Sequence, residues 1–441
     1  MPEINIAKYR GNKTAAFSLQ FDDSTPSQAD FAVPHLNARG LTGTFYINPG
    51  SERYQLRKRI WEEVCPLWGH ELANHTMLHQ GAKDYAEADQ QIGDCSRLIW
   101  SLYPDRSPLL AFQSGGGTTW GINGKQMAEL RHKYRCVIRE GLSIESNDPN
   151  TPLPFALSLV DKALKEGGWE SVFFHGVGPR AEWLGTTGEF FDALLDHVAK
   201  HKDKLWVGGW AEIHRYTKER DAAVIEVLNS SPDSLKFKIN TPGLDPELYT
   251  EPLTLITQHS SDWAAFAVEQ GGKTISSGTV NNGAAVFDAS PNKGPITLTK
   301  ADHAAAIPSS KPDLKNIMTL VQCGLLQGLT PSSLMDLPGD IGAFVFKGAD
   351  RAVAALWYHG RNPSTPVAFH DVINASIGIK FDKTDLKVPD VHLEDLRFSH
   401  KSGGHQTLLQ GKFELTSKPF YIRYNTCHLE DFITYGITLI L

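Results

Sequence analysis

Over the range Thr14–Asp221, short apolar segments alternate with longer amphipathic ones, and this alternation limits the possible folds more than any other property of the sequence. The apolar segments Ala15–Phe21 and Gly43–Ile47 are predicted to be buried strands, and the segment between them predicts a helix that ends at Gly40. Repeated strand–helix units favour a parallel sheet or barrel, with functional side chains at the carboxyl ends of the strands. We therefore predict an α/β fold here.

Further units continue the pattern. Helices are predicted at Ala86–Leu102, Lys125–Lys133, Pro154–Glu166, Gly188–His201 and, as a shorter run, Ala222–Leu228. Strands are predicted at Cys136–Ile138, Ser171–Phe174 and Leu205–Val207. The order of these segments keeps the strand–helix alternation up to the middle of the chain.

The second half of the chain has a different texture. Short apolar runs are separated there by Gly, Asn and Pro, which is typical of hairpin strands; Ala343–Lys347 and Ala352–Tyr358 form one such predicted pair. We predict a barrel over residues 1–230 and a mostly β second domain, a sandwich, over residues 240–441. No motif in this second domain assigns it a role.

Composition excludes several classes of protein. The 441 residues contain 43 Lys plus Arg and 50 Asp plus Glu, a net charge of −7 that gives no electrostatic footprint for nucleic acid or anionic lipid. Five widely spaced cysteines indicate neither a disulfide framework nor a zinc ribbon. No signal peptide or membrane-spanning segment is predicted, so we expect a cytoplasmic protein, or a secreted or periplasmic one if a leader was trimmed.

Two adjacent carboxylates, Asp22 and Asp23, follow the first predicted strand. Neighbouring residues on an extended backbone point in different directions, so one carboxylate can bind a metal while the other acts as a base. Taken alone, an Asp-Asp pair is more often a turn or a helix cap.

A second group of polar residues lies in the segment Gly69–His79. His75 and His79 are four residues apart, which on a helical turn places both imidazoles on one side, where they can share a cation. His70 and Asn74 add further coordinating or orienting groups. The segment is not a zincin motif, because Thr76 stands where HExxH requires Glu.

His175 ends the predicted strand Ser171–Phe174 and is followed by Gly176. A histidine in this position is either a satisfied core residue or a functional group at the carboxyl edge of the sheet.

Together, Phe21-Asp22-Asp23, the segment Gly69–His79 and Phe174-His175-Gly176 resemble the motifs of the polysaccharide deacetylase family (NodB-like, carbohydrate esterase family four). The resemblance covers about residues 10–220. It implies a distorted (β/α) barrel and the removal of acetyl groups, N- or O-linked, from a poly- or oligosaccharide with the help of one divalent metal.

Carried over residue by residue, the resemblance implies that Asp23, His75 and His79 are the metal ligands and that Asp22 is the catalytic base. His175 matches the family's catalytic acid. The implied metal is zinc, although a His-His-Asp site also accepts cobalt, nickel or manganese.

Two family features are missing. The arginine that orients the base should lie near residues 111–117, where there is none; Arg139 or Arg180 is a substitute, although each is expected to be a surface residue. The aspartate that orients the catalytic histidine is also absent, and Asp148 is a loose candidate.

Three residues are predicted to contact substrate. Trp120 follows the triple glycine, Trp183 lies in the glycine-rich loop after His175, and Gln113 precedes the triple glycine. An indole face suits the apolar face of a pyranose, although most tryptophans are core residues.

Two other functions remain open at this point. A related barrel hydrolase cleaves non-peptide C–N amide bonds, and a catalytically retired barrel binds glycan without turnover. The expected partner is an acetylated carbohydrate, with no nucleic acid and no membrane; the oligomeric state is not predicted.

Overall fold

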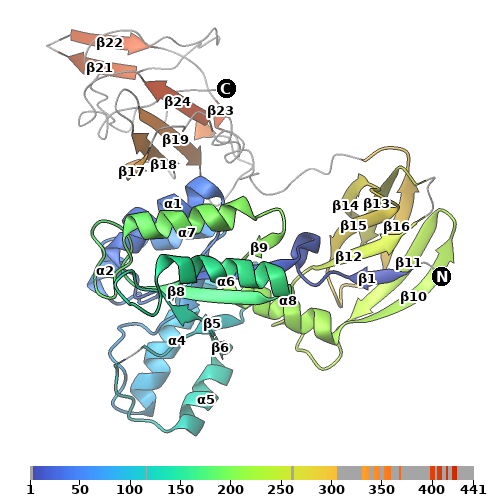
Figure 1. Ribbon diagram of the computed structural model, residues 1–441, viewed down its shortest axis with the longest axis horizontal. Coiled ribbons are helices and arrows are strands. Elements are labelled where there is room, and N and C mark those ends of the chain that lie inside the picture. Colours follow the sequence, from blue (N-terminus) through green and yellow to red (C-terminus); the bar gives the residue numbers. More distant parts are fainter. Residues whose placement is uncertain are drawn as a thin grey trace. The chain divides into compact units, whose positions relative to one another are not determined.

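The computed structural model describes residues 3–115, 117–259 and 263–304, together with the backbone of eight short strands between residues 330 and 424 (Figure 1). The chain divides into two compact units, Met1–Ala29 with Leu41–Pro308 and Asp30–Gly40 with Ser309–Leu441. We describe each unit separately.

The first unit is organised around a parallel sheet. Its strands are β2 (Ala15–Asp22), β3 (Thr44–Ile47), β4 (Glu71–Asn74), β5 (Leu110–Phe112), β6 (Cys136–Ile138), β7 (Leu142–Ser143), β8 (Trp169–Phe174) and β9 (Leu205–Val207). Their order is β6-β5-β4-β3-β2-β8-β7, and every neighbouring pair is parallel. β9 pairs with the first part of β2 and β3 with its second part, so the sheet curls into a distorted barrel. This confirms the predicted fold class.

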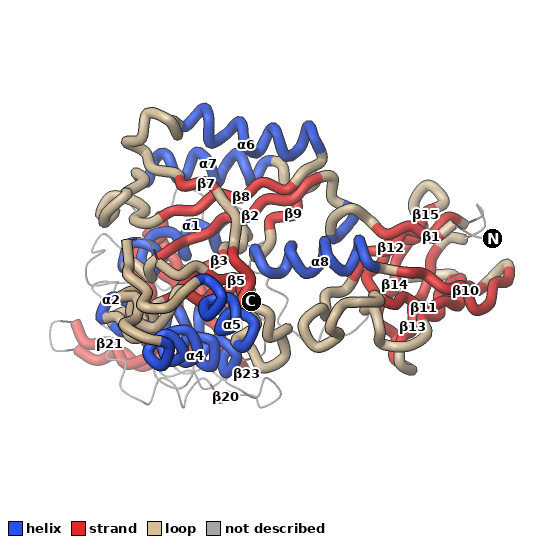
Figure 2. The backbone as a smooth tube through the Cα atoms, turned by 90° about the horizontal axis from the view of Figure 1, so that it is seen from below, coloured by secondary structure: helices blue, strands red, loops and turns tan. Residues whose placement is uncertain are grey.

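Helices separate the strands along the chain. The longer ones are α4 (Tyr85–Leu102), α5 (Gly124–Lys133), α6 (Leu153–Glu166), α7 (Gly188–Lys200) and α8 (Trp210–Ala222). Shorter helical segments are η1 (Arg10–Asn12), η2 (Gln28–Ala32), α2 (Glu52–Gln55), η3 (Ile60–Val64) and α3 (Cys65–Leu67). Figure 2 shows α6 and α7 running side by side next to β7 and β8. Among the described residues, none of these helices has the length and hydropathy that a bilayer crossing needs.

The centre of the sheet is β2, in which every residue is buried. Its Phe21 ring stacks on Phe45 of β3 at 4.7 Å and on Phe174 of β8 at 5.5 Å, measured between ring centroids. Burying aromatic side chains of this size is a dominant favourable term in folding. The packing therefore fixes the end of β2, and with it Asp22, against both neighbouring strands.

Two antiparallel sheets follow the barrel. One contains β1 (Ile4–Ile6), β12 (Leu253–Gln258) and β15 (Ala284–Ala289); the other contains β10 (Val224–Ser231), β11 (Ser234–Asn240), β16 (Ile296–Ala301), β13 (Ala265–Gln270) and β14 (Lys273–Thr279). Alternate residues of β11, such as Leu235 and Phe237, are buried with Leu255 and Phe287 of the other sheet in one apolar core. Two sheets that share a core in this way form a β-sandwich.

The sandwich and the barrel belong to the same compact unit. Its apolar core extends to Trp206 of β9 and to Ile213 and Tyr216 of α8. The predicted helix at Ala222–Leu228 is wrong: α8 ends at Ala222, and the following residues form β10, an edge strand. The division into domains at residues 1–230 and 240–441 stays a prediction.

The second unit contains α1 (Val33–Arg39) and the remaining described strands. A four-stranded antiparallel sheet has the order β17 (Thr330–Leu337), β18 (Ile341–Lys347), β19 (Ala352–Tyr358), β24 (Phe420–Tyr424). Two further antiparallel pairs are β20 (Val367–Ala368) with β23 (Glu414–Leu415) and β21 (Phe398–Ser402) with β22 (His405–Leu409). The register of β18 with β19 confirms the predicted hairpin.

A buried ion-pair network joins α8 to the residues that lead into the sandwich. Glu251 contacts Arg10 at 2.5 Å and Arg215 at 2.5 Å, and Arg10 also pairs with Glu212. Removing one partner from such a network leaves an uncompensated buried charge. The network therefore holds the start of the sandwich, at Glu251, against α8 of the barrel.

Glu219 of α8 lies at the edge of this network and gives stability a pH dependence. One carboxylate oxygen accepts a hydrogen bond from the backbone N–H of Glu251 at 2.9 Å, and the other is buried without a partner among the described residues. Burial, together with the charge of Glu251, raises the pKa of Glu219 from 4.5 to about 8. The folded protein therefore holds a proton that the unfolded chain releases, and stability falls as the pH rises from about 4.5 through 8.

We expect Glu219→Gln to remove this loss. The Tm of the wild-type protein should fall between pH 5 and pH 9, whereas the variant should change less and be more stable by a few degrees at pH 9. Glu226→Gln, at an exposed position of β10, is the matched control and should follow the wild type. Parallel Tm curves for wild type and Glu219→Gln would contradict the prediction.

Candidate functional site

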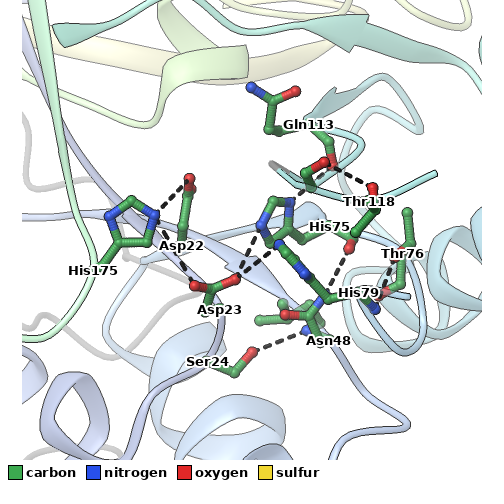
Figure 3. A network of polar contacts seen from close by, with 12 residues as sticks. Asp22, Asp23, Ser24, Asn48, His75, Thr76, His79, Gln113, Thr118 and His175 are labelled. Carbon is green, nitrogen blue, oxygen red and sulfur yellow. Dashed lines mark hydrogen bonds and ion pairs between the residues drawn. The ribbon is translucent and has the colours of Figure 1, made fainter. Parts of the chain in front are cut away.

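Four strands end at one place. Asp22 and Asp23 lie at the carboxyl end of β2, His75 follows β4, Arg139 follows β6 and His175 follows β8. Because all these strands are parallel, their carboxyl ends share one edge of the sheet. In Figure 3 the two aspartates lie between His175 on one side and His75 with His79 on the other.

Asp23, His75 and His79 form a compact cluster. The Nε2 atoms of both histidines lie 3.2 Å from Oδ1 of Asp23, and the two imidazole rings meet edge to face with centroids 4.7 Å apart. Asp23 and His75 are buried, while the His79 side chain is 22% exposed. The structure thus brings together the three residues predicted to be metal ligands.

The backbone that carries the two histidines is not a helical turn, and in this respect the prediction is wrong. Residues 75–79 form an irregular loop after β4, with positive φ at Thr76 (68°) and His79 (56°). The side-chain amide of Asn48 donates to the carbonyls of His75 and Thr76 and holds this loop in place. A spacing of four residues brings the imidazoles together here through loop geometry.

The polar groups before the loop have structural roles. His70 is buried and accepts a hydrogen bond from the backbone N–H of Gly43; burial lowers its pKa to about 3, so it is neutral. Asn74 donates to the carbonyl of Ile92 and accepts from the backbone N–H of Thr76 at 2.8 Å. Neither residue is part of the cluster formed by Asp23, His75 and His79. Asn74, the last residue of β4, supports the loop that carries His75 and His79.

The hydrogen bond between His75 and Gln113 fixes which ring nitrogen of His75 faces Asp23. Its Nδ1 lies 2.8 Å from the carbonyl oxygen of Gln113, and since a carbonyl only accepts, Nδ1 must donate. In neutral His75, Nε2 then directs a lone pair at Asp23 Oδ1, which is buried without a hydrogen-bond partner among the described residues. Burial and the neighbouring His75 lower the pKa of His79, which favours its neutral form. These facing lone pairs are satisfied by a cation, and His-His-Asp is a donor set that zinc and related metals accept.

The carboxylate of Asp23 has two further neighbours besides the histidines. Trp183 donates its indole N–H to Oδ2 at 2.9 Å, and Nη2 of Arg53 lies 3.7 Å from Oδ1. Burial alone would raise the pKa of Asp23; when the two imidazoles are protonated, the hydrogen bond and charge of His75, with the charges of His79 and Arg53, outweigh burial and hold the pKa well below its usual range. Asp23 is therefore a carboxylate with one oxygen oriented toward the histidines.

Asp22 has a separate partner. Its Oδ2 accepts a hydrogen bond from Arg139, and both side chains are buried, with exposures of 5% and 3%. The guanidinium lies over the rings of Phe173 at 3.8 Å and Tyr46 at 4.7 Å. Arg139 was expected to be a surface residue, and this expectation is wrong; the other candidate, Arg180, is exposed.

The signal that identifies Arg139 is present in the sequence. It follows directly after the strand Cys136–Ile138, as His175 follows β8. Its segment is held by Gln20 of β2, whose side chain donates to the carbonyl of Glu140 at 2.9 Å. An arginine at a strand end thus reaches Asp22 from β6, although the family's arginine was expected after β5.

His175 faces both aspartates. Its Nε2 lies 4.0 Å from Oδ2 of Asp22 and 4.0 Å from Oδ2 of Asp23, too far for hydrogen bonds in this arrangement. Its Nδ1 is buried without a hydrogen-bond partner among the described residues. The candidate orienting residue Asp148 instead accepts hydrogen bonds from Asn150, so it does not hold His175.

The three predicted substrate residues lie in different settings. Trp183 is 45% exposed and contacts Asp23. Trp120 donates to the hydroxyl of Thr118, which in turn donates to the carbonyl of Gly115. Gln113 holds His75 through its carbonyl, and its side-chain oxygen accepts from the backbone N–H of Ser114. Only Trp183 presents a large exposed face beside the cluster.

Comparison with known proteins gives distant similarities. No family model matches the sequence. A gellan lyase from a Bacillus species is 23% identical over an alignment of 330 residues, and the alignment covers 67% of this chain. The chain spans 13% of the length of that lyase.

Partial similarities also occur among solved structures. The peptidoglycan deacetylase PdaC from Bacillus subtilis is 19% identical, with a TM-score of 0.34 over 48% of this chain and 95% of that protein. A pseudoenzyme of the CE4 family from Bacillus anthracis is 17% identical, with a TM-score of 0.33 over 46% of this chain and 66% of that protein. These similarities concern the N-terminal half, the part for which the motifs predicted such a resemblance.

Proposed function

We propose that the chain is a metal-dependent hydrolase that removes acetyl groups from a poly- or oligosaccharide. The observation that carries this proposal is the division of labour between two adjacent carboxylates. Asp23 faces His75 and His79 at 3.2 Å each, whereas Asp22 pairs with Arg139; His175 lies 4.0 Å from both carboxylates. One carboxylate is thus available to a metal and the other to a proton.

Asp23, His75 and His79 would hold the metal through one carboxylate oxygen and two Nε2 atoms. A divalent cation bound there would polarise an acetyl carbonyl and lower the pKa of a bound water. Gln113 and Trp183 act on the ligands themselves: the carbonyl of Gln113 fixes the tautomer of His75, and the indole N–H of Trp183 occupies the second oxygen of Asp23.

In this proposal Asp22 acts as the general base. Arg139 occupies its Oδ2, and its Oδ1 is buried without a hydrogen-bond partner among the described residues, which leaves this oxygen free to accept a proton from water. Arg139 is a positioning residue, because it contacts Asp22 and is itself held between two aromatic rings.

In this proposal His175 acts as the general acid. His175 lies on the opposite side of the aspartates from the His75–His79 pair (Figure 3). A scissile bond held between the metal ligands and His175 would therefore have the base and the acid within reach. Trp183, 45% exposed beside Asp23 and with the guanidinium of Arg53 over its ring, would stack its exposed part on a sugar ring of the substrate.

Acetate release tests the proposal. The protein should release acetate from N-acetylated chitooligosaccharides or O-acetylated xylooligosaccharides, lose this activity after chelation, and regain it when Zn²⁺, Co²⁺, Ni²⁺ or Mn²⁺ is added. Cyclic and formylated amides belong in the same substrate panel, because turnover of these alone would replace the proposal with amide hydrolysis. Glycan binding without acetate release from any substrate would instead indicate a retired enzyme.

Gly115 gives a test of the metal ligands that leaves them chemically unchanged. It has a φ of +90°, and a Cβ added there would lie 2.9 Å from Nε2 of His79. We expect Gly115→Ala to displace His79 and weaken metal binding by about tenfold or more, measured by calorimetric titration. Gly117→Ala is the matched control: it also has positive φ, at +69°, but its added Cβ meets no atom of the described residues within 4 Å. Equal metal affinity in the two variants would contradict the prediction.

A further inference from the structure

A second group of two histidines and an aspartate lies on the outside of the barrel. His197 is in the last turn of α7, His201 is the residue that follows this helix, and Asp161 is in α6. His197 and His201 are four residues apart, so the curl of the helix places both imidazoles on the same side. The side chain of Asp161 reaches them from the neighbouring helix.

The donor atoms of these residues lie close together. Nε2 of His197 is 2.8 Å from Oδ1 of Asp161, and the two imidazole rings meet edge to face with centroids 5.1 Å apart. One donor atom from each residue lies within 4.8 Å of the other two. A tetrahedral metal with bonds of about 2.0–2.2 Å requires its donor atoms to lie closer to one another than this 4.8 Å limit. The Asp161 side chain is 61% exposed, so it is free to move the short distance that closes the site.

This group is remote from the candidate active site. α6 leads into the start of β8 and α7 into the start of β9, so the carboxyl ends of both helices lie at the amino-terminal edge of the sheet. Asp22 and Asp23 lie at the opposite edge. Both views show α6 and α7 side by side (Figures 1 and 2). Occupancy of one group therefore leaves the other accessible.

The dipole of α7 favours a cation at this place. The carboxyl end of a helix carries a partial negative charge, and His197 and His201 are at that end of α7. Lys162, the neighbour of Asp161 in sequence, pairs with Glu170 at 2.5 Å, so its ammonium is neutralised there. The contact between His197 and Asp161 explains why these two side chains lie together, but it does not involve His201. A metal ion bound by all three residues would also explain the position of His201.

We propose that Asp161, His197 and His201 form a second binding site for a divalent transition metal, of which zinc is the representative, and that the metal ties α6 to α7. Two imidazoles and one carboxylate suit zinc, copper or nickel, and three protein ligands leave one tetrahedral position for water. Only the folded chain brings the two helices together, so the metal binds the folded state and stabilises it.

Titration of Zn²⁺ into a variant without the first cluster tests the proposal. The double variant His75→Ala/His79→Ala should bind one equivalent of Zn²⁺ by calorimetry, and Zn²⁺ should raise its Tm. Adding His197→Ala should abolish both effects. Adding His132→Ala, an exposed histidine in the last turn of α5, should change neither. Binding that survives His197→Ala would overturn the proposal, as would a double variant that folds but binds no zinc.

Two further variants make the test independent of the first cluster. Asp161→Asn should weaken binding at the second site by about tenfold or more, and unchanged affinity would overturn a three-ligand site. If the double variant does not fold, the wild-type protein should bind one more equivalent than His197→Ala/His201→Ala, and equal stoichiometry would overturn the proposal. Acetate release should be the same in His197→Ala and in the wild type, so the outcome is separable from that of the proposed function.

Discussion

Asp22→Asn is expected to lower kcat for acetate release by about 10² to 10⁴ while the protein keeps its metal. The amide cannot take a proton from water, so the general base is lost. The change leaves Asp23, His75 and His79 untouched, and an amide oxygen can still accept a hydrogen bond from Arg139. Steady-state kinetics and metal content of the same preparation measure the two effects separately.

Asp23→Asn is the matched control for this prediction. It makes the same change, from carboxylate to carboxamide, at the neighbouring residue. In this case the lost carboxylate is the one that faces the two histidines. We expect it to lose both metal and activity. If Asp22→Asn loses metal, or retains near wild-type kcat, Asp22 is not the base.

Arg139→Met is expected to reduce activity by a factor comparable to the loss of the base and to destabilise the fold by about 3–5 kcal/mol. The arginine and Asp22 form a buried pair, and methionine fills part of the space without compensating the carboxylate. Urea denaturation measures the stability, and acetate release measures kcat for the folded fraction.

Arg139→Lys and a double variant separate charge from geometry. Lysine restores a positive charge but not the planar guanidinium that lies over Phe173 and Tyr46, so it should recover stability more than kcat. Asp22→Asn/Arg139→Met removes both charges and should be more stable than Arg139→Met alone. Full activity in Arg139→Met would show that Arg139 does not position the base.

The sequence predicted the residues that converge at the site better than the way in which they converge. Asp22, Asp23 and His175 follow apolar strands, and a strand end in a parallel α/β fold is a recognisable place. His75 and His79 were predicted to share a face of a helical turn, but they lie on a loop with left-handed residues. Spacing alone does not distinguish these backbones, because the positive φ of Thr76 and His79 depends on contacts such as those of Asn48.

The partner of Asp22 was missed for a similar reason. Arg139 is 117 residues from Asp22 in sequence, and composition favours the surface for an arginine. In the family that the motifs resemble, the arginine that orients the base is expected near residues 111–117, at the end of β5. The structure supplies it from the next strand along the sheet edge, β6.

Residue types and their order along the chain were sufficient for the α/β class, because hydrophobic periodicity is a local property, and the resemblance of three short motifs to a known family implied the candidate metal donors. The pairing of Asp22 with Arg139, of His75 with Gln113 and of Asp23 with Trp183 depended on the strand order β6-β5-β4-β3-β2-β8. Long-range packing sets that order, and no short segment records it. For the same reason, the second group at Asp161, His197 and His201 became visible only when two helices were placed side by side.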